Sequence, residues 1–352
     1  MTIIKTVALA IRYGEIFVLA ALLSAAPPAW AEPSGQPPQT LRSPPCDRAC
    51  LVGFADAYFA AALKHSPQGL ALSPTVRMTE NTEPLPIGDG VLWHGLDQLP
   101  GTFRFNVVDP QSGQIAVNAV LLIGSQKYLA VVRLKVEDGA ISEVEQLLSS
   151  FIQNAALPNL VRPRLALLTD VPAAKKNNRA DMVSLAGSYF DALTHDDSRL
   201  TRLATDCVRH ETGIRMTGNA VAPKLFLPPA IKADQQALMR KLFAIHSLRS
   251  CGQQIDSGMF ADLKIAPRRI LVVDEQKGLV AAFPMFIQTG QVRPTPLKGF
   301  PGIERLPTPL PSTSQWTEVF KIHSGEIHEI EALMFVQLNY GAGNGWTEGS
   351  GR

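Results

Sequence analysis

One internal repeat constrains this chain more than any other feature. Residues 185–211 read LAGSYFDALTHDDSRLTRLATDCVRHE, and residues 54–80 read FADAYFAAALKHSPQGLALSPTVRMTE. Each stretch predicts an amphipathic helix with a Tyr-Phe pair, a polar turn, and a strand that carries ionisable side chains. A second pair of similar stretches, KVEDGAISEVEQLL from Lys135 and KIHSGEIHEIEALM from Lys321, predicts two hairpins. The chain is therefore expected to fold as two modules with the same order of elements.

The first module is predicted to begin with a helix whose apolar residues recur at spacings near 3.6, namely Phe54, Tyr58, Phe59 and Ala62. A short helix is expected at Val91–Leu99. Strands are expected where β-branched and apolar residues run between turn residues: Thr102–Val108, Ile115–Ile123, Tyr128–Val136 and Ile141–Leu148.

The second module repeats this order from a helix at Ala180–Leu193, but it is longer. The separation between Lys135 and Lys321 exceeds the separation between Tyr58 and Tyr189, so the second copy contains additional residues. We place them at 213–251 and 289–315. The latter stretch is rich in proline, which predicts a long surface loop that overhangs part of the module.

The first 31 residues resemble a cleaved targeting signal. Lys5 and Arg12 precede an apolar run at Ile16–Leu23, and Ala29-Trp30-Ala31 is a small-x-small cleavage site. A membrane anchor is the alternative, but the run is far shorter than the roughly 20 residues that a spanning helix needs. We expect an exported protein, periplasmic or extracellular, without stable membrane insertion.

The predicted boundaries are a signal at 1–31, a Pro-rich leader at 32–45, the first module at 46–157, a linker at 158–179, the second module at 180–341, and a tail at 342–352.

Charge and cysteine usage limit the classes of partner. The formal net charge is +2 over 352 residues, with no basic block, which argues against nucleic acid. Cys46, Cys50, Cys207 and Cys251 are an even set in an exported chain, which favours two disulfides. Three pairings are possible. If Cys46 pairs with Cys50, then Cys207–Cys251 stabilises the chain by roughly 3–4 kcal/mol. A metal site is the alternative, but no second close pair or HExxH motif supports it.

The order of helix, strand, turn-rich middle and curved antiparallel sheet resembles the NTF2-like superfamily, which includes SnoaL-like cyclases, ketosteroid isomerases and limonene-epoxide hydrolases. It also resembles a group of exported bacterial and fungal proteins built from two such modules, with VRxTEN-type and CVRxE-type stretches. The resemblance implies an α+β fold: two cone-shaped modules, each a curved, mostly antiparallel sheet wrapped around helices. It also implies a pocket at the open end of each cone, where burial shifts the pKa values of carboxyl and phenol groups.

In the second module the resemblance places Tyr189 where ketosteroid isomerases have an oxyanion donor, and Glu211 where they have the proton-transferring carboxylate. Arg209 would bind an anionic substrate group or keep Glu211 ionised. His210 is a further catalytic candidate, although it lies on the opposite strand face from Glu211. The alternative for each is structural: a packed tyrosine and a surface ion pair.

In the first module Tyr58 matches Tyr189. When Arg77 is aligned with Arg209, the carboxylate position falls on Thr79, and Glu80 comes one residue late. Because strand side chains alternate, Glu80 would then face the other side unless a bulge intervenes. Trp93 and His94 are expected near the mouth of the cone, as substrate-binding candidates.

Two hypotheses for the function follow. The first is an exported acid–base enzyme without a cofactor (an isomerase, lyase, dehydratase or cyclase) acting on a small hydrophobic carbonyl or hydroxyl compound. The second is a non-catalytic ligand-binding or interaction protein, since one fold hosts both. In either case we expect the two modules to pair within the chain as a pseudo-dimer.

Overall fold

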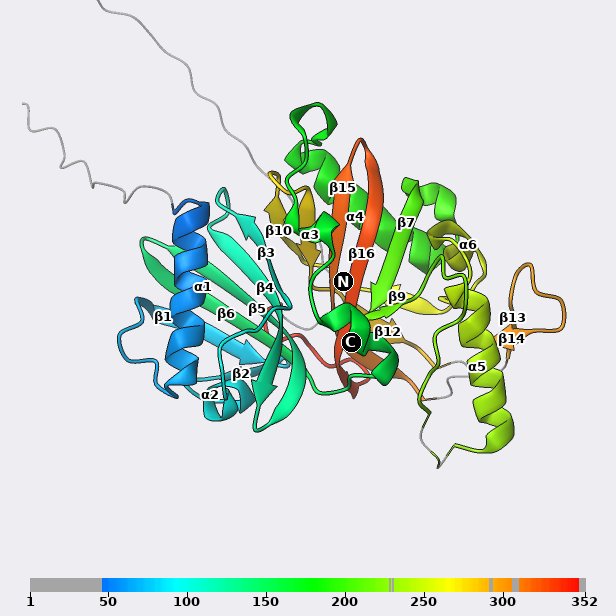
Figure 1. Ribbon diagram of the computed structural model, residues 1–352, viewed down its shortest axis with the longest axis horizontal. Coiled ribbons are helices and arrows are strands. Elements are labelled where there is room, and N and C mark those ends of the chain that lie inside the picture. Colours follow the sequence, from blue (N-terminus) through cyan, green and yellow to red (C-terminus); the bar gives the residue numbers. More distant parts are fainter. Residues whose placement is uncertain (1–45, 228, 230, 291–293, 306–309, 348–352) are drawn as a thin grey trace, which may run out of the picture. The chain divides into compact units, whose positions relative to one another are not determined.

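The computed structural model describes residues 46–347, apart from 228, 230, 291–293 and 306–309. The predicted signal and Pro-rich leader lie outside the described residues, as does the end of the predicted tail. Among the described residues, no helix is both long and apolar enough to span a membrane. The fold is mixed α+β with curved, mostly antiparallel sheets, which confirms the predicted fold class at that level (Figure 1).

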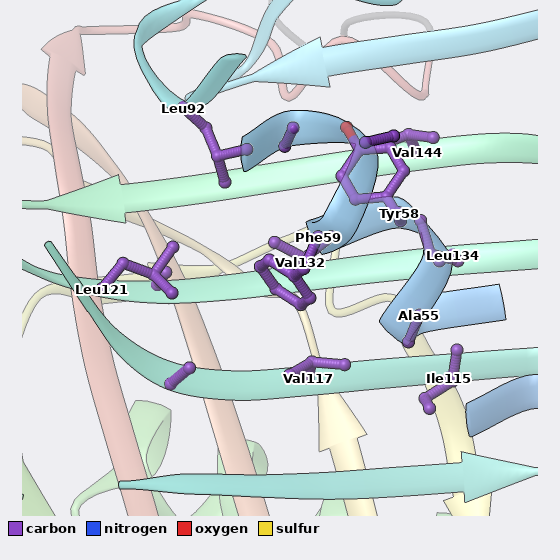
Figure 2. Packing of buried hydrophobic residues seen from close by; sticks show 14 of the residues in the cluster. Ala55, Tyr58, Phe59, Leu92, Ile115, Val117, Leu121, Val132, Leu134 and Val144 are labelled. Atoms are coloured by element: carbon purple, nitrogen blue, oxygen red, sulfur yellow. The ribbon is translucent and has the colours of Figure 1, made fainter. Parts of the chain in front are cut away.

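The first half of the described chain forms one sheet with a helix across it. Its elements are α1 (Arg48–Leu63), β1 (Leu72–Glu80), β2 (Glu83–Leu85), α2 (Val91–Gly95), β3 (Arg104–Asp109), β4 (Gln114–Ile123), β5 (Gln126–Glu137) and β6 (Ala140–Ser149). The strand order is β2-β1-β6-β5-β4-β3, with β1 parallel to β6 and the other neighbours antiparallel. Figure 2 shows the core that joins helix to sheet: Ala55, Tyr58 and Phe59 of α1 face Val117 and Val132.

Short helical turns connect the halves: η1 (Asn154–Leu160), α3 (Leu165–Leu168) and η2 (Ala173–Lys175). The second half contains α4 (Arg179–His195), η3 (Ser198–Leu200), β7 (Leu203–Glu211), β8 (Ile214–Arg215), α5 (Ala233–Ser247), α6 (Cys251–Asp256), β9 (Leu263–Ile265), β10 (Ile270–Asp274), β11 (Leu279–Ala282), β12 (Met285–Gln288), β13 (Thr295–Pro296), β14 (Glu304–Arg305), β15 (Ser312–His323) and β16 (Glu326–Asn339). Its main sheet has the order β8-β7-β16-β15-β11-β10, and β12 joins β15 to β9.

The two sheets share a pattern of strand directions, although the second also contains β9 and β12. In both, the strand after the long helix runs parallel to the last strand of the half, and the remaining main-sheet neighbours are antiparallel. The predicted additional stretch at 213–251 holds α5 and ends where α6 begins, and the stretch at 289–315 holds the β13–β14 hairpin. The sheet therefore keeps its topology, and the insertions add structure at its edge.

The strand register corrects our alignment of the two copies. Glu80 pairs with Gln146, and Glu211 pairs with Ala332. The separation between Gln146 and Ala332 equals the separation between Lys135 and Lys321, the first residues of the two similar hairpin stretches. Gln146 and Ala332 are therefore equivalent positions. Glu80 is thus the equivalent of Glu211, and these two glutamates are as far apart in the chain as the two tyrosines. Matching the Val-Arg dipeptides shifted the strands by one residue, so the placement of the carboxylate position at Thr79 was wrong.

Both disulfides are confirmed: Cys46–Cys50 and Cys207–Cys251. All four cysteines are consumed by these bonds, so the alternative of a cysteine metal site does not apply. Disulfides persist in oxidising compartments, which is consistent with an exported protein.

Candidate functional site

Three candidate residues of the first half, Tyr58, Glu80 and Trp93, form one hydrogen-bond network. The Tyr58 hydroxyl donates to Gln146 Oε1 at 2.9 Å and accepts from Trp93 Nε1 at 2.9 Å. Tyr58 and Trp93 are both fully buried. Trp93 is therefore a core residue that holds the tyrosine hydroxyl, and it is not exposed to a ligand at the mouth of the cone.

Glu80 has a structural task in the same network. Its carboxylate accepts from the backbone N–H groups of Val91 and Leu92, at 2.7 and 3.1 Å, and from Gln146 Nε2 at 3.2 Å. It therefore caps the first turn of α2, where the free N–H groups of a helix favour an anion. The one candidate carboxylate for catalysis in this half, Glu80, therefore has a structural role: it holds α2 over the sheet.

The other two candidates of the first half lie at the surface. The His94 imidazole is 68% exposed and lies 3.5 Å from Asp89. Arg77 is exposed, donates to the carbonyl of Gly345 and lies over the Trp346 ring. Neither side chain belongs to the Tyr58 network, so the first half does not gather its predicted site residues.

The second half contains a pocket of about 390 Å³. It lies between β7 and the inserted helices, and its size falls in the range of small-molecule sites. Most of its wall is apolar. The lining residues are Arg209, Glu211, Met216, Leu225, Met239, Leu242, Phe243, His246, Gln254, Met259, Phe260, Gln288 and Arg305.

Arg209 is the more buried of the two arginines that line this pocket. Its Nη2 lies 2.8 Å from Glu211 Oε2, and its guanidinium faces the Phe260 ring. Burial opposes the charge, yet Tyr189, Glu211 and Glu318 hold the pKa of Arg209 above its usual value. The predicted pair of Arg209 and Glu211 is thus brought together at the pocket, whereas Tyr189 is buried next to Arg209 and is not part of the lining.

Tyr189 and Glu318 complete a buried cluster. The Tyr189 ring packs against Phe190 and Phe320. Burial and the neighbouring Glu318 raise the pKa of Tyr189, while Arg209 opposes the rise. Glu318 is fully buried, and neither of its carboxylate oxygens has a hydrogen-bond partner among the described residues. Burial raises the pKa of Glu318 to about 8, although Arg209 counteracts it.

Strand pairing explains why the two glutamates share an environment. Ala332 on β16 pairs with Glu211 on one side and with Glu318 on the other. Residues opposite each other on neighbouring strands point to the same sheet face. The small alanine between them leaves space on that face for the larger side chains.

The matching row of the first sheet carries Glu80, Gln146 and Val132. In the position equivalent to Arg209 the first half has Met78, which pairs with Val144 as Arg209 pairs with Ile330. The second half therefore replaces a methionine and a valine with an arginine and a glutamate. Buried charges are costly to keep. At these two positions only the second half has ionisable side chains, and they lie next to its pocket, so we take that half as the candidate site.

His246 is the histidine of the pocket. It lies on α5, is buried, and neither ring nitrogen has a hydrogen-bond partner in the described part of the chain. Burial, with Arg209 and Arg249 nearby, lowers the pKa of His246 to about 4, so the imidazole is neutral at pH 7. We did not select it from the sequence because it lies in an insertion without a counterpart. Its closeness to Cys251, the disulfide partner of Cys207, was the available signal.

His210 lies away from this pocket. It pairs with Glu331 and follows the alternation of β7, so it points to the face opposite that of Arg209 and Glu211. Burial and the nearby cations of Arg164 and Arg215 lower its pKa to about 3. The prediction that only one of His210 and Glu211 enters the pocket is consistent with this geometry, and Glu211 is the one that does.

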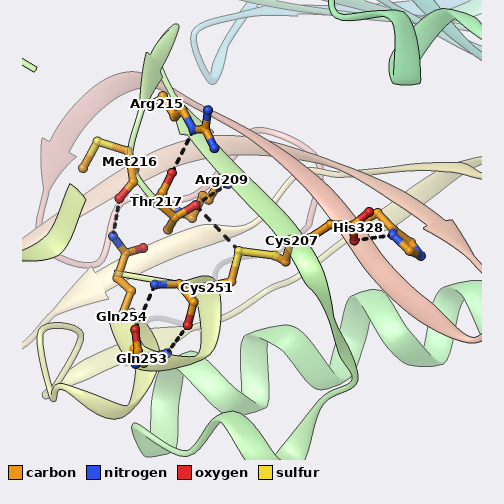
Figure 3. The surroundings of a disulfide bond; sticks show 11 residues. Cys207, Arg209, Arg215, Met216, Thr217, Cys251, Gln253, Gln254 and His328 are labelled. Atoms are coloured by element: carbon orange, nitrogen blue, oxygen red, sulfur yellow. Dashed lines mark hydrogen bonds and ion pairs between the residues drawn. A yellow bond between two sulfur atoms is a disulfide. The ribbon is translucent and has the colours of Figure 1, made fainter. Parts of the chain in front are cut away.

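The Cys207–Cys251 disulfide fixes the pocket wall (Figure 3). Thr217 Oγ1 accepts from the backbone N–H of Arg209 at 2.7 Å and contacts Cys251 Sγ at 3.8 Å. Gln254 Nε2, on α6, donates to the Met216 carbonyl at 2.9 Å. The inserted helices are thereby tied to the strand that carries Arg209.

Comparison with known proteins adds one family and a set of distant structures. Residues 175–334 match the family described as a domain of unknown function, DUF8021, which covers less than half of the chain. No curated protein matches significantly. AclR, a candidate hydroxylase from Streptomyces galilaeus, is 13% identical, with 45% of this chain and 81% of that chain covered and a TM-score of 0.25. A candidate polyketide cyclase from Silicibacter sp. TM1040 is 14% identical, with 44% and 90% covered and a TM-score of 0.25.

Glu318 predicts a specific pH dependence of stability. The unfolded chain releases this proton above about pH 4.3, whereas the folded state retains it up to about pH 8, so stability falls as the pH rises between these values. The variant Glu318→Gln keeps the shape and removes the titration. Its free energy of unfolding should equal that of the wild type near pH 4 and exceed it by more than about 2 kcal/mol at pH 8. Urea denaturation at both values measures this, and an equal difference at both would contradict it.

Proposed function

We propose that the second half is the site of an exported acid–base enzyme that needs no cofactor and acts on a small hydrophobic carbonyl or hydroxyl compound. Arg209 and Glu211 support this proposal, because they line one mostly apolar pocket, and the buried Tyr189 and Glu318 interact with Arg209. We further propose that both halves are NTF2-like modules, of which the first has become structural.

The chemistry follows from the positions of the groups. The Glu211 carboxylate, 31% exposed, would take a proton from the carbon next to a substrate carbonyl. The negative charge would then develop on the carbonyl oxygen, where the Arg209 guanidinium stabilises it, with Tyr189 beside the guanidinium. Glu211 would return the proton to a different carbon, so an isomerisation is balanced without another reactant. The apolar wall limits competing water.

A binding protein without catalysis is the second candidate, and one observation favours it. The Arg209–Glu211 ion pair satisfies both charges within the protein, as a recognition site does when it keeps its polar groups in place. Both candidates use the same pocket and differ in whether a proton leaves the ligand.

Proton abstraction can be measured directly. We expect the protein to accelerate exchange of the α-hydrogens of small ketones for deuterium in D₂O, followed by NMR over a panel of enolisable compounds. Glu211→Gln should lower the rate at least about 100-fold, the usual contribution of a general base. Glu326→Gln, at the exposed β15–β16 turn, is the matched control and should leave the rate unchanged. Binding of the ketones without exchange would instead support the binding protein.

A further inference from the structure

The pocket has an unequal balance of charge. Its lining contains two arginines, Arg209 and Arg305, and one carboxylate, Glu211. Glu318, the other acidic group of the cluster, keeps its proton at neutral pH because burial raises its pKa to about 8. The charged groups of the lining alone therefore sum to +1 at pH 7, and Asp262, which is 44% exposed, balances Arg305 from outside the lining. An anionic ligand is accordingly favoured by the hydrogen-bond donors of the two arginines.

The two guanidinium groups also have unused donors. Arg209 directs Nη2 to Glu211, and Arg305 directs Nη2 to Asp262 at 3.0 Å. In the described part of the chain, the Nε atom of each is buried without a hydrogen-bond partner. A buried donor without a partner costs free energy, and a charged donor costs more. A ligand that brings acceptor oxygens relieves that cost.

The rest of the wall suits a flexible apolar body. Met216, Met239 and Met259 lie with Leu225, Leu242 and Phe243 around the pocket. Methionine side chains are unbranched and polarisable, so they adapt to ligands of different shape. At about 390 Å³, the pocket is at the small end of the range for ligand sites.

We propose that this pocket binds a small amphipathic monocarboxylate, such as a medium-chain or aryl carboxylic acid. The carboxylate accepts hydrogen bonds from the arginine Nε groups, and the apolar body lies along the methionines. A carboxylate suits these donors because hydrogen bonds between a guanidinium and a carboxylate are charge-assisted and therefore strong. The inference rests on the pocket of the proposed function and specifies the substrate class for it.

The test compares three ligands with the same chain length: octanoate, 2-octanone and 1-octanol, measured by isothermal titration calorimetry with the full chain at pH 7. Octanoate should bind at least tenfold more tightly than the other two. Arg209→Met, which installs the residue that the first half has in this position, should weaken octanoate binding at least tenfold and change 1-octanol binding less than threefold. Arg305→Gln should act in the same direction if Arg209→Met does not fold.

Two control variants test whether the change in octanoate binding arises in the pocket. Arg249→Gln removes an equal charge from a residue that stacks on Phe300 and is not part of the lining, so octanoate binding should be unchanged. Met239→Trp fills the pocket and should abolish binding of all three ligands.

The outcomes separate this inference from the proposed function. If octanoate does not bind, or if 2-octanone or 1-octanol binds equally well, the carboxylate preference is overturned. The exchange of neutral ketones in D₂O is independent of that result. Loss of exchange in Glu211→Gln would still support the enzyme when octanoate fails to bind.

Discussion

Replacing Asp109 with alanine should lower the free energy of unfolding by about 3–5 kcal/mol, the usual cost of breaking a buried ion pair. Asp109, at the end of β3, is 1% exposed. It accepts two bonds from Arg179, at 2.9 and 2.5 Å, and one from the backbone N–H of Val273 on β10, at 3.0 Å. The variant would leave the Arg179 guanidinium and this N–H without their acceptor, at the junction of the two halves.

The junction has a second aspartate in the equivalent place. Asp274, at the end of β10, accepts from the guanidinium of Arg48 and from the backbone N–H of Val108 on β3 at 3.1 Å. Arg48 and Arg179 each begin the long helix of their half, and their separation in the chain equals that of the two tyrosines. Each half therefore gives the other the same set of contacts, as two subunits do across a two-fold interface. This reciprocity supports our proposal of an intramolecular pseudo-dimer.

Because Asp109 and Asp274 have equivalent contacts, the prediction for Asp109 extends to Asp274. Asp274→Ala should cost about as much as Asp109→Ala. Urea denaturation of the single and double variants measures both costs and their coupling. Asp56→Ala is the matched control, because Asp56 pairs with Arg104 at 2.7 Å but is 54% exposed, and such pairs contribute about 0–1 kcal/mol. Losses at the two buried aspartates no larger than this control would contradict the prediction.

The pH dependence of Asp109→Ala provides an independent check. Burial alone would raise the pKa of Asp109, but hydrogen bonds from Arg179, Ser112 and Val273 hold it below the usual value. A depressed pKa stabilises the folded state above the unfolded value, about 3.9, and this stabilisation is lost as the pH falls. The difference between the wild type and the variant should therefore shrink below about pH 4.

The local elements were predictable because their signals are local. The apolar spacing around Tyr58 predicted α1, and Asp138-Gly139 predicted the β5–β6 turn. The strand register was not predictable in this way. Both strands contain a Val-Arg dipeptide, and matching the two dipeptides gives a different register from matching the distances to Tyr58 and Tyr189. Pairing across the sheet shows that Arg209 corresponds to Met78, and that Val208 corresponds to Arg77.

The polar core of the site was only partly visible in the sequence. Glu318 alternates with Trp316, Phe320 and Ile322, which belong to the buried core, so the pattern placed a carboxylate on the inner face of β15. Reading that alternation would have found it. His246 could not be placed in the same way, because only the tertiary fold brings α5 to the pocket. The pocket depends on how the inserted helices dock, and the Cys207–Cys251 bond ties α6 to β7.

Replacing Cys207 and Cys251 together with alanine should destabilise the protein by about 4 kcal/mol, because the bond closes a 44-residue separation and limits the unfolded chain. The matched control is the Cys46→Ala, Cys50→Ala double variant. That bond closes a separation of 4 residues, so its loss should cost about 2 kcal/mol. Urea denaturation of both double variants, without reductant, gives the two values.

The same pair of variants distinguishes a general effect on stability from an effect on the pocket. Cys251 begins α6, and Thr217 lies between Cys251 and the backbone of Arg209, so loss of the Cys207–Cys251 bond should loosen the wall beside the guanidinium. Octanoate binding should weaken severalfold in the Cys207→Ala, Cys251→Ala variant under conditions where it remains folded. The Cys46–Cys50 bond lies at the start of α1, in the other half, and its loss should leave octanoate binding unchanged. Equal weakening in both variants would show that the bond acts only through global stability, and that α5 and α6 hold the pocket without it.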